Sequence, residues 1–249
     1  MYTYKNYTLR NYREIEALKK LNKIDYDAIE IVGNVLPFKT NNYVVENLID
    51  WGNIPEDPIF TLTFPRKEML QNHHYSKVEK MFYDGLQPDQ MKPLINDIRH
   101  ELNPHPAGQK HNVPQIDGVE LTGVQHKYRE TVLFFPSQGQ TCHAYCTFCF
   151  RWPQFVGMAD MKFAMKEVEL LTKYLKAHRE VTDVLFTGGD PLIMSTKRLA
   201  FYIDELLDDD LYNIQTLRFG TKALAYWPYR FTKDEDADEL IKLFDKIIA

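Results

Sequence analysis

Three cysteines form one compact motif that could bind a metal. The chain of 249 residues contains only Cys142, Cys146 and Cys149, separated by three and then by two residues. Three thiolates on one short loop are suitable ligands for a soft metal. A structural zinc site normally needs a fourth ligand, and His143 would be an awkward one inside so tight a loop. A two-cluster ferredoxin would carry a fourth cysteine just downstream, and the sequence has none. The spacing therefore favours a 4Fe–4S cluster with three protein ligands and one open iron, to which a small molecule can bind.

A second motif that could bind a ligand is the run from Gly188 to Pro191, which reads Gly-Gly-Asp-Pro. Its two glycines would allow the backbone to approach a ligand closely. The carboxylate of Asp190 could receive a cation such as an ammonium group. A Gly-Gly-Asp run is by itself most often an ordinary turn. It gains weight here because it directly follows a predicted buried strand.

The elements that must position these motifs alternate between strands and helices. Short β-branched and aromatic runs predict strands buried on both faces, and apolar residues at helical spacing predict helices between them. The predicted strands are 131–135, 181–187 and 214–219, and the predicted helices are 161–178, one around 199–206, and one opened by a capping box at Thr232 and Glu235. Alternation of this kind predicts successive βα units with a parallel sheet. In such folds the chemistry lies beyond the carboxyl ends of the strands, where the cysteine loop, the Gly-Gly-Asp-Pro run and residues 220–222 all fall.

Composition limits the class of protein. The net charge of −5 gives no indication of a nucleic-acid-binding surface, and no apolar run is long enough to span a membrane. The N-terminal residues lack the basic and apolar regions of a signal peptide. An odd number of closely spaced cysteines excludes a disulfide framework and indicates a reducing compartment. We therefore expect a cytoplasmic protein with neither a nucleic-acid nor a membrane partner.

Two regions follow from a change in sequence pattern. Residues 1–125 are expected to form a helical, loop-rich N-terminal region, with helical stretches at 12–22 and 75–84. Residues 126–249 carry the βα units. Five histidines could suggest a metal site, but they lie in a polar context without ligand spacing, and we expect solvated loop histidines at His73, His74, His100, His105 and His111.

The cysteine spacing closely resembles that of the radical S-adenosylmethionine (SAM) superfamily, which also prefers an aromatic residue where Phe148 stands. Within it, the chain resembles the lysine 2,3-aminomutase family in four segments, namely 126–135, 142–151, 186–191 and 217–222. The resemblance implies an α/β fold, a partial (β/α) barrel of radical SAM type with three βα units present of about six. It also implies that SAM chelates the open iron and is cleaved reductively to a 5′-deoxyadenosyl radical, which abstracts hydrogen from an amino-acid substrate for a 1,2-amino shift with pyridoxal phosphate (PLP).

The resemblance also assigns roles to individual residues. It makes the three cysteines the cluster ligands and Arg151 the group that binds the substrate carboxylate. It places the SAM contacts at Phe148, Gly188, Gly189 and Asp190, and a PLP-phosphate contact at Lys127. The family's Schiff-base lysine has no counterpart among the matched positions, and Lys222 is interpreted as a surface lysine.

Several further expectations and alternatives accompany this resemblance. An electron donor such as flavodoxin or ferredoxin is expected, and the protein could be a homo-oligomer. Because three βα units are about half of the family's barrel, the chain is expected to be a truncated gene or a fragment. Two alternatives stay open: a radical SAM enzyme of the same scaffold that does not use PLP, and a non-enzymatic iron–sulfur or zinc-binding protein.

Overall fold

The computed structural model describes residues 3–103, 111–158 and 162–248, which divide between two compact units. The sheet unit contains the described residues of 111–142 and 162–248. The helical unit contains residues 3–103 and 143–158. The cysteine motif is therefore shared, since Cys142 belongs to the sheet unit while Cys146 and Cys149 belong to the helical unit.

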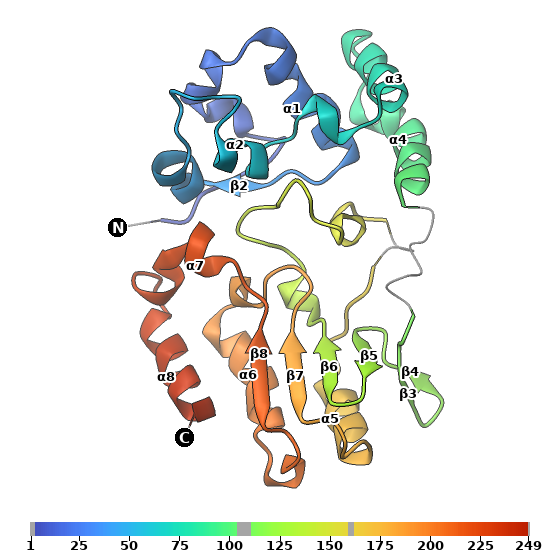
Figure 1. Cartoon of the computed structure of the whole chain (residues 1–249), viewed down its shortest axis with the longest axis vertical. Coiled ribbons are helices and arrows are strands. Elements are labelled where there is room, and N and C mark those ends of the chain that lie inside the picture. Colours follow the sequence, from blue (N-terminus) through green and yellow to red (C-terminus); the bar gives the residue numbers. More distant parts are fainter. Residues whose placement is uncertain (1–2, 104–110, 159–161, 249) are drawn as a thin grey trace. The chain divides into compact units, whose positions relative to one another are not determined.

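The sheet unit is built on four strands in the order β5-β6-β7-β8 (Figure 1). They are β5 (Val124–Tyr128), β6 (Thr131–Phe134), β7 (Asp183–Phe186) and β8 (Thr216–Phe219). Strands β6, β7 and β8 are parallel, and β5 pairs with β6 in the antiparallel direction. A small hairpin, β3 (Gln115–Ile116) and β4 (Val119–Glu120), precedes them. The predicted α/β class and the three parallel strands are confirmed, and in the described part of the chain the sheet does not close into a barrel.

The apolar face of this sheet is covered by α5 (Val168–Ala177), α6 (Thr196–Leu206) and α8 (Ala237–Ile248), and the short α7 (Ala223–Tyr226) lies beyond the carboxyl end of β8 (Figure 1). The core alternates along each strand, so that Val132 and Phe134 of β6 and Val184 and Phe186 of β7 are fully buried. Their neighbours Leu133 and Leu185 are only half-buried. The expectation of strands fully buried on both faces is therefore wrong, because only alternate side chains enter the core with the helices.

Two predicted helix boundaries are also wrong. Helix α5 begins at Val168 rather than near residue 161, because Met165 pairs with Pro136 in an isolated parallel bridge and holds this segment extended. Helix α8 begins at Ala237, and Thr232 and Glu235 lie in the turns before it. The segment before α8 forms a short 3-10 helix (Pro228–Phe231) instead, so Thr232 does not open the helix with a capping box.

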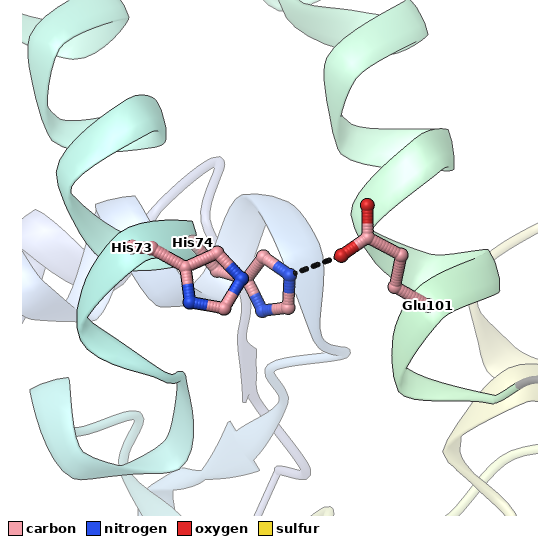
Figure 2. A group of neighbouring side chains, drawn as sticks. All are labelled: His73, His74 and Glu101. Carbon is pink, nitrogen blue, oxygen red and sulfur yellow. Dashed lines mark hydrogen bonds and ion pairs between the residues drawn. The ribbon is translucent and has the colours of Figure 1, made fainter.

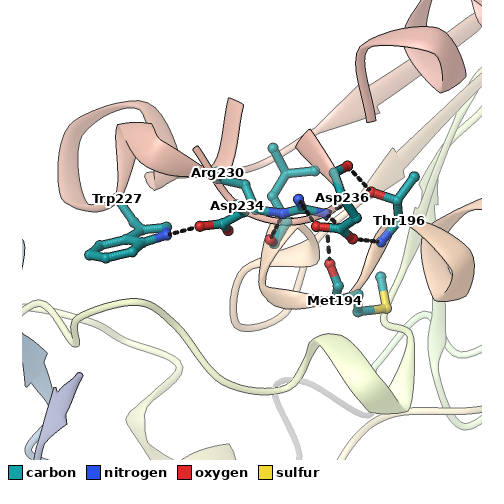
Figure 3. Close-up of polar contacts among 7 residues, drawn as sticks. Met194, Thr196, Trp227, Arg230, Asp234 and Asp236 are labelled. Carbon is teal, nitrogen blue, oxygen red and sulfur yellow. Dashed lines mark hydrogen bonds and ion pairs between the residues drawn. The ribbon is translucent and has the colours of Figure 1, made fainter. Parts of the chain in front are cut away.

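Arg230 connects this segment to the loop that follows the Gly-Gly-Asp-Pro run (Figure 3). Its guanidinium, only 3% exposed, donates to the carbonyl oxygens of Leu192 at 3.0 Å and Met194 at 3.1 Å. It also donates to the hydroxyl of Thr196 at 3.0 Å and to the carboxylate of Asp236 at 2.8 Å. The buried cation thus has several acceptors, which is the condition under which burying an ion pair does not destabilise the fold.

The helical unit contains α1 (Lys23–Val35), α2 (Pro58–Thr63), α3 (Asn72–Tyr83) and α4 (Pro88–Leu102). A two-stranded ribbon, β1 (Asn6–Tyr7) and β2 (Thr40–Asn41), lies in the same unit, as does a π-helical turn (Val44–Leu48). Helices α1, α3 and α4 share one core, built from Ala28, Ile31, Val32, Val35, Leu36, Leu70, Tyr75, Val78, Met91, Ile95 and Ile98. The predicted stretch 75–84 lies mostly in α3, whereas the stretch 12–22 forms two short 3-10 helices (Tyr12–Glu14 and Glu16–Lys20).

The histidines do not all lie in solvated loops as expected. His73 and His74 are in the first turn of α3, where His74 is buried, and His100 is on α4. His111 is exposed in a turn, and His105 lies outside the described residues. The polar sequence around His73 and His74 concealed the apolar spacing of α3, whose residues Tyr75 and Val78 are buried.

We expect Arg230→Ala to lower the free energy of unfolding by about 3 kcal/mol, because it leaves Asp236 and several carbonyl groups without their charged donor. Urea denaturation measures the loss, and hydrogen exchange of the β6, β7 and β8 amides assigns it to the sheet unit. The matched control is Arg218→Ala, which removes an exposed pair with Asp183 and should cost less than about 1 kcal/mol. Equal losses in the two variants would contradict a special role for Arg230.

Candidate functional site

The Gly-Gly-Asp-Pro run packs against the segment that leads directly into Cys142. A Cβ atom added to Gly189 would lie 2.3 Å from the carbonyl oxygen and 2.4 Å from the amide nitrogen of Thr141. One added to Gly188, whose φ is +124°, would lie 2.2 Å from the side-chain amide of Gln140. Gly189 therefore requires glycine because a side chain would displace the backbone of Thr141, and Gly188 requires it because L side chains rarely adopt its positive φ.

Asp190 connects three loops at the carboxyl ends of the parallel strands. Its amide donates to the carbonyl oxygen of Thr141 at 2.7 Å. Its buried carboxylate accepts from the hydroxyl of Thr221 at 2.7 Å, the amide of Lys222 at 2.8 Å and the amide of Leu192 at 2.9 Å. The loops after β6, β7 and β8 are thus held together by a single side chain and its backbone amide.

The helical unit holds the rest of the cysteine loop through backbone hydrogen bonds. Thr147 donates its amide to Leu62 at 2.9 Å and its hydroxyl to Thr61 at 3.0 Å, and both acceptors are carbonyl groups at the end of α2. The last carbonyl groups of a helix receive no hydrogen bond from within the helix. The cysteine loop therefore supplies donors to carbonyl groups that would otherwise lack them. The amide of Cys149 donates to the carbonyl oxygen of Cys146 at 3.0 Å, which closes a tight turn between these two cysteines.

The three cysteines do not form disulfides with one another, and each is partly exposed. Burial raises the pKa of Cys149, and a hydrogen bond from the backbone amide of Arg151 acts in the opposite direction. Burial lowers the pKa of Arg151, whereas the nearby Cys149 raises it. Arg151 is half-buried, and its guanidinium lies 5.3 Å from the ring centre of Phe150. A permanently charged arginine is therefore present two residues from the last cysteine.

The aromatic residues of the loop are unusually exposed, with Phe148 at 70% and Phe150 at 75%. Both contribute to a cavity of about 290 Å³ within the helical unit, whose lining also includes Leu36, Met69, Leu102, Thr147, Cys149 and Trp152. An open apolar surface beside a cysteine is suited to binding a small molecule or a partner.

The structure does not bring Lys127 to the same end of the sheet as these motifs. Lys127 lies on β5 between His126, which pairs with Val132, and Tyr128, which pairs with Thr131. This position is beside the amino end of β6, and Lys127 is exposed there. Lys222 does lie at the carboxyl end, after β8, where its amine is 5.7 Å from the ring centre of Tyr226. Lys222 is exposed, as expected of a surface lysine.

The sequence did not indicate Gln140 and Thr141 as contributors to this site. They lie immediately before the cysteine motif, so the glycines at 188 and 189, which permit close approach, could have indicated them. Residues 220–222 were expected at this rim, but the contact of the Thr221 hydroxyl with Asp190 was not, because 31 positions separate the two residues.

The residues present fit an iron–sulfur cluster and a small ligand better than they fit PLP. Three thiols make a soft donor set, and the glycines allow backbone to lie close to the segment before Cys142. For PLP, the one phosphate contact suggested by sequence is Lys127, which lies at the other end of the sheet. Lys127 therefore does not contribute a PLP-phosphate contact beside the cysteine motif.

We expect Gly189→Ala to displace residues 139–141 and to destabilise the sheet unit by roughly 1–3 kcal/mol, since a backbone clash must be relieved. The amide of Asp190, which donates to Thr141, should lose its protection from hydrogen exchange. Gly220→Ala is the control, because its added Cβ would make an ordinary contact of 3.4 Å with Thr187. Retained protection of Asp190 in Gly189→Ala would show that the close approach is not required.

Comparison with known proteins shows which proteins this chain is similar to. No family model matches the sequence. A protein of Aquifex aeolicus named "Putative L-lysine 2,3-aminomutase" is 27% identical over 93% of this chain and 51% of its own length. L-lysine 2,3-aminomutase of Methanococcus maripaludis is 23% identical over 94% of this chain and 45% of its own length. The enzyme of that name from Bacillus subtilis is 24% identical over 91% of this chain and 40% of its own length. The chain thus spans about half the length of the curated relatives that it matches, and over that span it is similar to proteins named lysine 2,3-aminomutase.

Proposed function

We propose that this chain binds a 4Fe–4S cluster through Cys142, Cys146 and Cys149, with SAM at the open iron, and that it serves a radical isomerisation of an amino acid by a 1,2-amino shift, for which the resemblance implies PLP as a further cofactor. When bound, the cluster and SAM supply an electron and a carbon-centred radical that takes hydrogen from the substrate. The observation that carries the proposal is the packing of Gly188, Gly189 and Asp190 against the segment that ends at Cys142.

In this proposal the protein's own residues mainly fix the positions of the loops beside Cys142. Thr141 and Asp190 fix the backbone that precedes Cys142, and the two glycines allow residues 140–141 to pack closely against this run. The carboxylate of Asp190 accepts three hydrogen bonds from the protein, so its contribution to SAM binding would be made largely through the loop that it holds. Phe148 would place its exposed ring beside the ligand.

Arg151 is proposed to bind the substrate carboxylate. A guanidinium can donate two parallel hydrogen bonds to a carboxylate, which fixes the orientation of an amino acid. Partial burial strengthens such an interaction because less water competes for the charge. This role would position the carbon from which hydrogen is taken.

A second candidate function is a radical SAM enzyme that does not use PLP. The observation that favours it is the position of Lys127 at the amino end of β6. In either case the substrate would be a small amino-acid-like molecule and the electron would come from a donor such as flavodoxin or ferredoxin. None of the described helices is both long and apolar enough to cross a membrane. A cytoplasmic location and a possible homo-oligomeric state are parts of the proposal.

After anaerobic reconstitution we expect about four irons per chain and formation of 5′-deoxyadenosine when dithionite and SAM are added. Cys146→Ala should abolish SAM cleavage and lower the bound iron, since it removes a cluster ligand. Iron analysis and chromatography of the nucleoside products measure these effects. The control is Lys222→Met, which alters an exposed lysine on the same rim and should retain both properties.

Different outcomes separate the alternatives. Zinc in place of iron that is lost in Cys146→Ala, without SAM cleavage by the unsubstituted chain, would exclude both radical SAM functions. SAM cleavage without a borohydride-sensitive absorbance from added PLP would favour the second candidate. Arg151→Ala should still cleave SAM but should lose coupling to an amino-acid substrate, and unchanged coupling would remove Arg151 from the proposed site.

A further inference from the structure

Three potential metal ligands meet at the open end of the α3–α4 hairpin (Figure 2). His73 and His74 come from the first turn of α3, and Glu101 comes from the last turn of α4. One ligand atom from each of the three side chains lies within 4.8 Å of the other two. The Nε2 atom of His74 is 2.7 Å from a carboxylate oxygen of Glu101. Residues separated by 27 positions in sequence thus present two imidazoles and one carboxylate to the same point.

The two histidines are oriented in an unusual way for neighbours on a helix. Successive helical side chains point about 100° apart, so adjacent residues do not normally face each other. Here the ring centres of His73 and His74 are 3.9 Å apart, with the rings inclined at 49°. The exposed His73 ring therefore lies over the buried His74 ring, and both approach the carboxylate of Glu101 (Figure 2).

The position and the exposure of Glu101 favour binding of a cation. The carboxylate of Glu101 lies 2.7 Å from Nε2 of His74. This negative charge lies in the last turn of α4, where the helix dipole disfavours an anion. The side chain of Glu101 is 58% exposed, so an ion can reach it from solvent. A bound cation would offset the unfavourable placement of the carboxylate.

His74 is held inside the helical unit with its Nε2 atom beside the carboxylate of Glu101. Its side chain is 3% exposed, and Nε2 lies 2.7 Å from a carboxylate oxygen of Glu101. Packing around His74 therefore fixes one imidazole of the cluster in place. A side chain that is already fixed loses little conformational entropy when it binds an ion.

We propose that His73, His74 and Glu101 bind one divalent transition-metal ion of the Zn²⁺ type, with water in the remaining position. Two imidazoles and a carboxylate are suitable ligands for Zn²⁺ and too rich in nitrogen for Ca²⁺ or Mg²⁺. Bonds of about 2.1 Å require ligand atoms roughly 3.4 Å apart, so modest side-chain movements would complete the site. The exposed ring of His73 can make such a movement without disturbing the core.

The proposed ion would act as a structural clamp. The chain itself joins α3 to α4 at one end of the hairpin through residues 84–87, whereas the ion would join their other ends. Between these points the helices contribute Tyr75, Val78 and Ile98 to the core of the helical unit. Leu102, which follows Glu101, lines the same cavity as Cys149. The clamp would therefore support a wall of the cavity beside the cysteine loop.

The test uses the full chain in which Cys142, Cys146 and Cys149 are replaced by alanine, so that no thiol can bind the added ion. We expect Zn²⁺ to bind at one equivalent, measured by equilibrium dialysis. At a hundredfold excess over the dissociation constant, Zn²⁺ should raise the melting temperature of the transition that includes the helical unit by about 5–10 °C. Zinc-edge X-ray absorption of the complex should show nitrogen and oxygen ligands.

Variants of the exposed ligands make this test decisive even if a His74 variant does not fold. His73→Gln and Glu101→Gln, in the same background, should each weaken Zn²⁺ binding at least tenfold and abolish the thermal shift. His111→Gln, an exposed histidine outside the cluster, is the control and should leave both unchanged. Absence of binding at millimolar Zn²⁺, or binding that survives His73→Gln and Glu101→Gln, would overturn the proposal. Because the cysteines are absent from this test, its result is independent of the proposed radical SAM function.

Discussion

The carboxylate of Asp190 is the interaction on which the architecture of the candidate site depends. It is buried at the carboxyl end of the parallel sheet and accepts from Thr221, Lys222 and Leu192, while its own amide donates to Thr141. Hydrogen bonds to an ionised group are stronger than neutral ones, and a buried charge is stable only when several donors surround it. The loops after β6, β7 and β8 are therefore mutually dependent, and the segment before Cys142 takes its position from the other two.

A second set of buried contacts, made by Arg230, stabilises the loop that follows Asp190. Arg230 donates to Leu192, Met194 and Thr196, so the chain that leaves the Gly-Gly-Asp-Pro run is held at both of its ends. Asp190 fixes the start of this loop and Arg230 fixes its continuation into α6. Two oppositely charged buried side chains thus immobilise one loop, and a rigid loop holds a ligand without losing conformational entropy on binding.

The sequence was sufficient for the strands and insufficient for what connects them. Runs such as 131–135 and 181–187 predicted parallel neighbours because burial and β propensity agree there. The segment 161–167 was misjudged, since its pairing with Pro136 depends on a contact distant in sequence. The same reason explains why the bonds of Asp190 with Thr221 and Lys222 and the contact of His74 with Glu101 were not predicted, since each joins residues 27 or more positions apart.

The glycines of the Gly-Gly-Asp-Pro run illustrate how a structural requirement and a functional one can coincide. Gly189 is required because the backbone of Thr141 leaves no space for a Cβ atom, and Gly188 because L side chains rarely adopt its positive φ, whether or not a ligand is bound. What gives the run functional meaning is the identity of the segment that it contacts, which continues directly into the first cysteine. Since the Asp190 carboxylate already accepts three hydrogen bonds, a cation that recruited it directly would have to replace some of them. Recognition through the exposed edge of the loop backbone leaves those bonds intact, and it is therefore the less costly way for this rim to hold a ligand.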